Sequence, residues 1–316
     1  MFFNIILLVV GLLLLIKGAD WLVNGASSIA RKKQVSDLAI GLTIVAFGTS
    51  APELVVNIAA SIDNHQDIVF GNIIGSNNFN LFFILGIAGL ISPLVVKSST
   101  LFKEIPVSLV AGITVLVLVN NFTFQGALLS RIDGIILLIF FLMFLAYVYF
   151  QLKEEPVVHE VKESYLPTWK LWGLIIIGLL GLVIGGRMVV ASAVYMASTM
   201  GISEKLVGLT IIAAGTSLPE LATSVMAAIK NKSDIAIGNI IGSNIFNIFF
   251  ILGISATVRP LVYDIAFNRD IYLFLGGTAL LFLFLYLGKK KFSRLAAGFM
   301  MLAFIAYTTY LITLET

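Results

Sequence analysis

Long apolar runs separated by short polar stretches dominate the chain, and each run is long enough to cross a lipid bilayer. Apolar and polar residues do not alternate as they do in membrane β-strands, so the runs predict helices. The first run continues through Trp21 and Ile29 without a basic leader, which favours a span over a signal peptide. The ten predicted spans are residues 2–30, 36–64, 67–91, 103–120, 127–152, 168–200, 203–231, 234–258, 267–288 and 291–314.

Composition excludes several classes of protein. Of the 316 residues, 59% are hydrophobic and 12% are charged, and the mean hydropathy is +1.04. Soluble domains carry about 25% charged residues, so an ordinary soluble globule is excluded. The chain has no cysteine, which excludes disulfide scaffolds, thiolate metal sites and cysteine nucleophiles. The net charge of +3 is too small for a nucleic-acid-binding protein, and the lipid bilayer is the expected surrounding.

The basic residues lie mostly on one side of this topology. Fourteen Lys and Arg residues are in loops that follow odd-numbered spans, and four (Arg131, Lys205, Arg259 and Arg269) are in the opposite loops. Basic loops remain in the cytoplasm, so both termini are predicted to lie outside, an N-out/C-out arrangement. Residues 153–167, the only long charged stretch, are predicted to form a cytoplasmic linker rather than a regulatory element.

An internal repeat organises the chain. Residues 36–94 align with residues 203–261 at a constant offset of 167, with 34 identities in 59 positions. Each half therefore contains five predicted spans, in residues 1–152 and 168–316. An odd number of spans turns the second half over in the membrane, which predicts an inverted repeat with a site at the midplane. The residues that both copies retain are polar or helix-breaking, which common ancestry and packing alone do not explain.

Two prolines are predicted to interrupt corresponding helices. Pro52 and Pro219 lack an N–H and clash with the carbonyl four residues earlier, so breaks are predicted around residues 46–50 and 213–217. Carbonyls released near such breaks can line a cavity. The predicted oxygen ligands at this level are the carbonyls of Ala46 and Ala213 and the hydroxyls of Thr49, Ser50, Thr216 and Ser217.

Glu53 and Glu220 lie about halfway along their predicted spans. An isolated carboxylate at that depth costs several kcal/mol, so an intramembrane glutamate indicates a functional site. The alternative is a glutamate that is protonated or paired with Lys17 or Arg187. Two equivalent residues would then have to share the same fate, so the functional interpretation is favoured.

The second repeated segment, GNIIGSN-x-FN, supplies further oxygens. Serine and asparagine four residues apart share one helix face, so each such pair can face the centre. These residues are Ser76 and Asn80 in the first half and Ser243 and Asn247 in the second. The glycines of the segment favour close helix packing. Asn72 and Asn239 fit either interhelical hydrogen bonding or ion coordination, and Asp67 and Asp234 are predicted to be N-caps.

This donor set suits a hard cation. It contains oxygens only, because both histidines, His65 and His159, are in predicted loops. Ca²⁺ takes six to eight oxygens and commonly uses carboxylates, whereas transition metals favour His or Cys. Two glutamates balance one Ca²⁺ or two Na⁺. Mutually exclusive occupancy by these ions would produce exchange.

The two segments, GTSAPE/GTSLPE and GNIIGSN-x-FN in both halves, resemble those of the cation/Ca²⁺ exchanger superfamily, and most nearly those of prokaryotic sodium/calcium exchangers. The resemblance implies a prokaryotic cell-membrane protein with an all-α, ten-helix inverted-repeat fold. In this fold the second, third, seventh and eighth helices enclose the ions and the first and sixth slide across them. It also implies Ca²⁺ ligation by Glu53, Glu220, Thr49 and Thr216. The implied Na⁺ ligands are Ser50, Ser76, Asn80, Ser217, Ser243 and Asn247, with the carbonyls of Ala46 and Ala213.

One position departs from the family pattern. Many sodium/calcium exchangers carry Asp where this chain has Asn247. With two central carboxylates, a third Na⁺ would leave an uncompensated positive charge, so a 3:1 stoichiometry is in doubt and K⁺ or H⁺ coupling remains open. The oligomeric state is also open, and a monomer is compatible with the sequence.

Other functions fit less well. A cation channel needs weak sites and a continuous pore. An intramembrane hydrolase using Ser50 or Ser217 would need a base, and no predicted span contains a histidine, so no enzymatic activity and no cofactor are expected. Asp20 and Arg187 occupy equivalent positions in the first and sixth helices. Their charges are expected either to approach one another or the lipid interface as these helices slide, or, equally, to snorkel or form hydrogen bonds locally.

Overall fold

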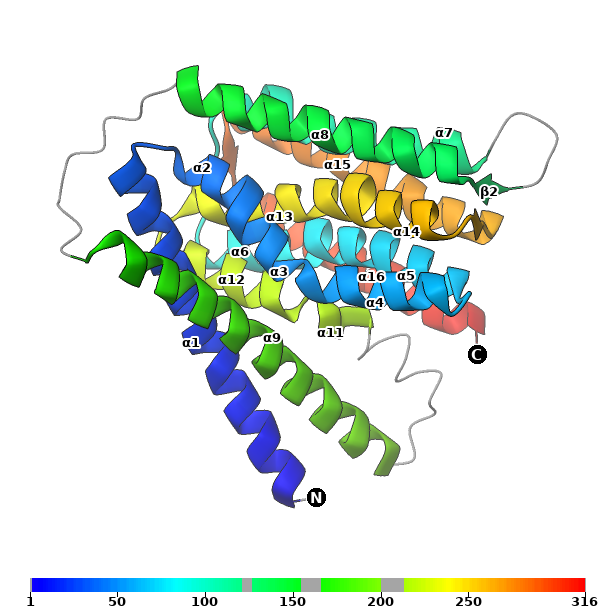
Figure 1. Cartoon of the computed structure of the whole chain (residues 1–316), viewed down its shortest axis with the longest axis horizontal. Coiled ribbons are helices and arrows are strands. Elements are labelled where there is room, and N and C mark those ends of the chain that lie inside the picture. The colour runs from blue at the N-terminus through cyan, green and yellow to red at the C-terminus, as the bar shows by residue number, and fades with distance from the viewer. Residues whose placement is uncertain (1, 121–126, 155–165, 200–212, 316) are drawn as a thin grey trace.

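Two long crossing helices lean against a compact bundle in the computed structural model, which describes residues 2–120, 127–154, 166–199 and 213–315. The crossing helices are α1 (Phe2–Lys33) and α9 (Thr168–Thr199). Figure 1 shows that the N-terminal end of α1 and the C-terminal end of α9 project away from the bundle. At 1.5 Å per residue each exceeds the bilayer thickness of about 30 Å, so a tilted helix can still span it.

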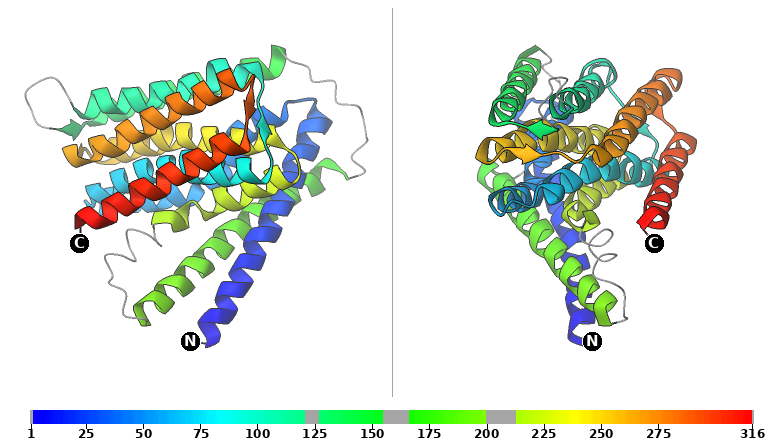
Figure 2. Two further views of the ribbon diagram at one scale, coloured as in Figure 1. Left: turned by 180° about the vertical axis from the view of Figure 1, so that it is seen from behind. Right: turned by 90° about the vertical axis from the view of Figure 1, so that its right-hand side faces the viewer.

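The bundle is built around two nearly buried helical segments at its centre, residues 66–91 and 233–258 (Figure 2). The first half contributes α2 (Asp37–Ile40), α3 (Ala46–Thr49), α4 (Ala51–Ile62), α5 (Gln66–Asn78), α6 (Leu85–Ile91), α7 (Ile105–Val119) and α8 (Arg131–Glu154). The second half contributes α11 (Ala213–Thr216), α12 (Leu218–Ile229), α13 (Ser233–Ile245), α14 (Gly253–Val258), α15 (Asn268–Leu287) and α16 (Arg294–Glu315). π-Helical turns at Gly41–Val45, Phe79–Ile84, Thr100–Glu104 and Phe246–Leu252, and a 3₁₀ turn at Ile265–Phe267, complete the helical segments.

These helices confirm an all-helical membrane protein. Within the described ranges, eight helical segments are long and apolar enough to cross a membrane, and residues 37–62 form a ninth candidate bent by 47°. The predicted span 203–231 is described only from Ala213, because residues 200–212 lie outside the described residues. The predicted linker 153–167 also falls largely outside them.

Two predicted spans begin too early. Leu128–Leu129 forms strand β2, paired with β3 (Leu261–Val262), and Lys291–Phe292 forms β4, paired with β1 (Leu94–Val95). The predicted helices 127–152 and 291–314 therefore start at Arg131 and Arg294. The sequence does not reveal these strands, because two residues are too few to show the alternation that distinguishes a strand from a helix.

The secondary structure repeats with the sequence. At the offset of 167, the first and last residues of α4 correspond to those of α12, those of α5 to those of α13, and those of β1 to those of β3. The π-helical turns beginning at Phe79 and Phe246 also correspond. The repeat in the sequence is therefore also a repeat of local structure.

Glycines bring the backbones of α1 and α9 into direct contact. A Cβ on Gly18 would lie 2.8 Å from the carbonyl oxygen of Gly178, and one on Gly11 would lie 2.9 Å from that of Gly185. Real Cβ atoms do not approach backbone this closely. The close crossing therefore requires glycine, as in small-residue packing of membrane helices.

Gly178→Ala is expected to lower the free energy of unfolding by about 1–3 kcal/mol, because its Cβ would meet backbone atoms of Leu22 and Gly18 rather than a movable side chain. The matched control is Gly173→Ala on the same helix, where nothing lies within 4 Å of the added atom. Thermal unfolding in detergent would measure both. Equal melting temperatures for the two variants would contradict the packing argument.

Candidate cation site

Both predicted helix breaks are present at the centre of the bundle. α3 ends at Thr49 and α4 begins at Ala51, with Ser50 between them outside helical geometry. α11 ends at Thr216 and α12 begins at Leu218, with Ser217 in the corresponding position. Each proline is the second residue of its new helix, where its missing N–H costs no intrahelical hydrogen bond.

The Ala46 carbonyl is not released by its break. It accepts the N–H of Ser50 at 3.0 Å. The N–H that Pro52 lacks would have bonded the carbonyl of Gly48, four residues earlier, so the proline leaves the Gly48 carbonyl rather than that of Ala46 without this bond. Ala213 begins α11, and the residues before it lie outside the described ranges.

Each glutamate is bonded by the serine of the other half. The Ser50 hydroxyl donates to Glu220 Oε1 at 2.9 Å, and the Ser217 hydroxyl donates to Glu53 Oε1 at 3.1 Å. Ser243 adds a longer contact of 3.5 Å to Glu220 Oε1. Both glutamates are 1% exposed, and the hydrogen bond that each accepts comes from the helix break of the other half. The two breaks thus form one site that spans both halves.

The glutamates are not neutralised by the basic residues considered from the sequence. Lys17 and Arg187 are exposed, and no salt bridge to Glu53 or Glu220 occurs in the described part of the chain. The predicted alternative of a structural ion pair is therefore wrong in this conformation. Two like charges in a low-dielectric centre need a proton or a cation to balance them.

Two threonine–asparagine bonds lie beside the glutamates. The Thr49 hydroxyl donates to Asn239 Oδ1 at 3.0 Å, and the Thr216 hydroxyl donates to Asn72 Oδ1 at 3.1 Å. Asn239 also donates to Ser224 at 2.9 Å. Of the two roles that the sequence allowed, Asn72 and Asn239 therefore perform interhelical hydrogen bonding here.

Asn80 and Asn247 belong to a cluster of four amides. Asn80 Nδ2 donates to Asn244 Oδ1 at 3.2 Å, and Asn247 Nδ2 donates to Asn77 Oδ1 at 3.0 Å. Sequence reasoning did not include Asn77 and Asn244 among the site residues, although their identity at the offset of 167 was the available signal. Asn77 and Asn244 accept the amide N–H groups of Asn247 and Asn80, which leaves the side-chain oxygens of Asn80 and Asn247 outside these hydrogen bonds.

Five oxygen atoms at this centre are buried and have no hydrogen-bond partner among the described residues. They are Glu53 Oε2, Glu220 Oε2, Ser76 Oγ, Asn80 Oδ1 and Asn247 Oδ1. The elements that carry them contact one another. A buried acceptor without a partner costs about 1–3 kcal/mol, so this set fits a hard cation that takes oxygen ligands.

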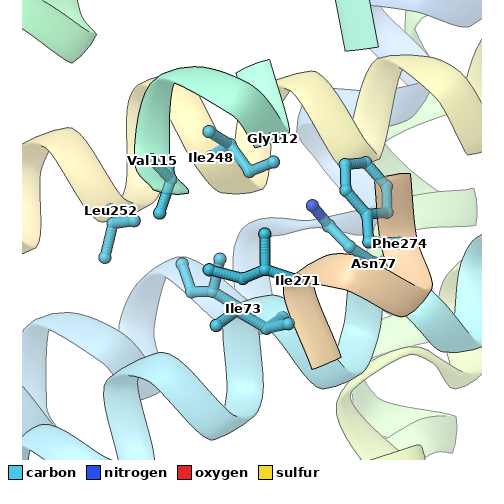
Figure 3. A pocket seen from close by; sticks show the side chains of 9 residues that line it. Ile73, Asn77, Gly112, Val115, Ile248, Leu252, Ile271 and Phe274 are labelled. Carbon is cyan, nitrogen blue, oxygen red and sulfur yellow. The ribbon is translucent and has the colours of Figure 1, made fainter. Parts of the chain in front are cut away.

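A small cavity adjoins the amide cluster at Asn77, and its lining is mostly apolar. Figure 3 shows Asn77 as the one labelled polar side chain among apolar ones that include Ile73, Val115, Ile248 and Phe274. The cavity lacks a carboxylate among its lining residues. Its apolar lining does not suit a dehydrated cation, so the oxygen cluster remains the candidate site.

Asp67 and Asp234 are not N-caps. α5 and α13 begin at Gln66 and Ser233, so each aspartate lies in the first helical turn. In the first turn, the positive end of the helix dipole stabilises the negative charge of the aspartate. Asp234 also approaches Lys97 at 3.7 Å. The observed N-cap positions are His65 and Lys232, two residues before the predicted caps.

Comparisons with known proteins show what the whole chain is similar to. The model of the sodium/calcium exchanger protein family matches residues 3–150 and 170–313. The chain is 40% identical over 313 residues to the putative antiporter CaxA of Alkalimonas amylolytica, covering 96% of each chain. It is 33% identical over 299 residues to the sodium/calcium exchanger MaX1 of Methanosarcina acetivorans, covering 82% of this chain and 84% of MaX1. A solved structure of the sodium–calcium exchanger NCX_Mj, soaked with Na⁺ and Ca²⁺, matches with a TM-score of 0.82 and 33% identity over 96% of this chain and 97% of NCX_Mj.

Proposed function

Because the chain belongs to the sodium/calcium exchanger family, a family of multi-pass cell-membrane cation antiporters, we propose that it exchanges Ca²⁺ for Na⁺ by alternating access. The ions occupy the site between the two halves, near the midplane. The homologues are transporters rather than enzymes, which supports transport without covalent chemistry.

The proposed architecture has ten spanning helices in two inverted repeats, residues 1–152 and 168–316, joined by a cytoplasmic linker at 153–167. Both termini lie outside, as the distribution of basic loops indicates. The inverted relation is supported by hydrogen bonds that occur twice with their roles exchanged. Ser50–Glu220 becomes Ser217–Glu53, and Thr49–Asn239 becomes Thr216–Asn72, when each residue is replaced by its counterpart.

The observation that carries the proposal is the pair of buried glutamates with unpartnered oxygens. One Ca²⁺ or two Na⁺ neutralise two carboxylates. If one Ca²⁺ and two Na⁺ were bound at the same time, two positive charges would remain unbalanced in a low-dielectric centre. Binding of one ion type therefore disfavours the other. The site must release one before it takes the other, which is the thermodynamic basis of exchange.

The proposed ligands follow the sequence prediction. Ca²⁺ binds between Glu53 and Glu220, with Thr49 and Thr216 beside them. Na⁺ uses the remaining hydroxyl, amide and carbonyl oxygens of Ser50, Ser76, Asn80, Ser217, Ser243, Asn247, Ala46 and Ala213. The four serine and threonine hydroxyls at the breaks donate their protons to other groups, which leaves their oxygen lone pairs available to an ion. The Ala46 carbonyl already accepts a backbone N–H, so an ion would use its second lone pair.

Uptake of ⁴⁵Ca²⁺ into proteoliposomes tests the proposal. Vesicles loaded with Na⁺ and diluted into Na⁺-free buffer are expected to accumulate Ca²⁺, and vesicles with equal Na⁺ on both sides are not. The same measurement with H⁺ or K⁺ gradients distinguishes Ca²⁺/H⁺ or K⁺-coupled exchange, the second candidate that Asn247 leaves open. Uptake that is independent of all three gradients would contradict exchange and favour a channel.

A further inference from the structure

One ion pair ties the crossing helices to the bundle. Lys230 Nζ donates to Asp20 Oδ1 at 2.5 Å, to the Asp20 carbonyl at 3.3 Å and to Asn24 Oδ1 at 2.6 Å. Asp20 and Asn24 are on α1, and Lys230 is the C-cap of α12. Asp20 is therefore paired with Lys230 in this structure rather than with Arg187.

The internal repeat assigns this pair a counterpart of reversed polarity. At the offset of 167, Asp20 corresponds to Arg187 on α9, and Lys230 corresponds to Asp63, the C-cap of α4. Arg187 and Asp63 are both exposed here. Neither charge is favoured locally, because an acidic residue opposes the dipole at a helix C-terminus and an arginine within a membrane helix is costly.

The contact between α1 and α9 is itself symmetric under the repeat. Exchange of the two halves converts the Gly11–Gly185 contact into Gly178–Gly18, and both contacts are present at nearly equal distances. The two helices can therefore keep their mutual contact while their position on the bundle changes. They form one unit.

The seating of this unit on the bundle is not symmetric. α9 covers both helix breaks, because Leu179 lies where a Cβ on Gly48 would project and Val190 lies where a Cβ on Gly215 would project, at 2.5 and 2.3 Å. The counterparts of these two side chains are Leu12 and Val23 on α1. Leu12 is 45% exposed in this structure. If each residue is replaced by its counterpart at the offset of 167, Leu12 contacts Gly215 and Val23 contacts Gly48. This arrangement defines a second position of the α1–α9 unit on the bundle.

We propose that Asp20–Lys230 and Arg187–Asp63 are alternative ion pairs that each brace one position of the α1–α9 unit. The inference rests on the proposed alternating access and adds what stabilises each access state. Lys230 is on the predicted cytoplasmic side and Asp63 on the predicted outer side. The pair observed here therefore braces the cytoplasmic face, and Arg187–Asp63 braces the outer face in the other state.

Cysteine cross-linking tests this without relying on transport, because the chain has no native cysteine. The double variant Asp63→Cys/Arg187→Cys in membrane vesicles is expected to cross-link at least about five-fold faster than Asp67→Cys/Arg187→Cys, whose first position is also exposed and lies on the same predicted side. Added Lys230→Ala removes the competing pair and is expected to raise the cross-linking rate a further two- to five-fold, about the effect of an exposed ion pair. Lys232→Ala, which removes only a bundle-internal pair with Asp37, is expected to leave the rate unchanged.

Cross-linking of the Asp63/Arg187 variant no faster than its control, or equal rates with and without Lys230→Ala, would overturn the alternative pairs. Failure of the proposed ion exchange gives a different result. If cross-linking behaves as expected but Na⁺ gradients do not drive ⁴⁵Ca²⁺ uptake, the two braced states stand and the ion assignment fails. If uptake is normal and cross-linking fails, the ion assignment stands and the ion pairs are contradicted.

Discussion

Glu53→Gln and Glu220→Gln are each expected to reduce Na⁺-driven Ca²⁺ uptake by about 30-fold or more. Either change leaves one buried carboxylate, which cannot balance a dehydrated divalent ion. Loss of one charge from a buried, hydrogen-bonded pair costs about 2–5 kcal/mol, and each 1.4 kcal/mol is a factor of ten. The amide retains the size of the side chain and can still accept the serine hydroxyl. The fold should therefore survive, and ⁴⁵Ca²⁺ uptake in proteoliposomes measures the loss.

Glu104 provides a matched control. It is a fully buried glutamate on the π-helical turn before α7, where it accepts hydrogen bonds from Tyr147 and, at 3.2 Å, from Gln151. It belongs to neither helix break. Glu104→Gln is expected to retain Ca²⁺ uptake within a few-fold of the native protein. Unimpaired uptake in both central variants, or an equal loss in all three, would contradict the assignment of the ion site.

Asn247→Asp is expected to make exchange depend on the membrane potential. The native site carries two negative charges, so exchange of two Na⁺ for one Ca²⁺ moves no net charge. A third carboxylate accommodates a third Na⁺, and each cycle then carries one net charge. Moving one charge across a potential of 100 mV changes the free energy by about 2.3 kcal/mol. This corresponds to about a fifty-fold change in the equilibrium ratio of Ca²⁺ concentrations across the membrane. Uptake at potentials imposed with K⁺ and valinomycin measures this change.

Asn120→Asp is the control for an added charge. Asn120 lies at the end of α7, away from the central cluster, and exchanges hydrogen bonds with Asn268. This variant is expected to remain insensitive to potential. A native protein that already responds to potential, or an Asn247→Asp variant that does not, would contradict the charge balance proposed for the site.

The internal repeat made much of the candidate site predictable. Both helix breaks occur at the residues before Pro52 and Pro219, and both central glutamates are buried as expected. The breaks follow from a local rule, because a proline lacks the N–H that continues a helix wherever the helix lies. The burial of the glutamates follows from their position halfway along apolar spans. The partners across the two halves could not be predicted in this way. The Ser50–Glu220 bond joins residues 170 positions apart, and nothing in either segment specifies which hydroxyl meets which carboxylate.

The errors have the same origin. Leu128–Leu129 is apolar and was placed in a helix, but pairing with Leu261–Val262 extends it. The equivalent positions of Asp20 and Arg187 likewise did not indicate that the crossing of α1 over α12 brings Asp20 to Lys230. Hydropathy and spacing describe how one segment partitions and folds, and these contacts arise between segments.

The sequence alone determined the membrane environment, the repeat, the helix breaks and the two glutamates, because lipid solvation and proline geometry act on each segment separately. The tertiary structure decided which atoms meet. It brought Asn77 and Asn244 against Asn247 and Asn80, left one oxygen of each glutamate without a partner among the described residues, and seated α9 on both breaks. These outcomes depend on how closely packed helices register against one another, which is a property of the assembled bundle rather than of any one span.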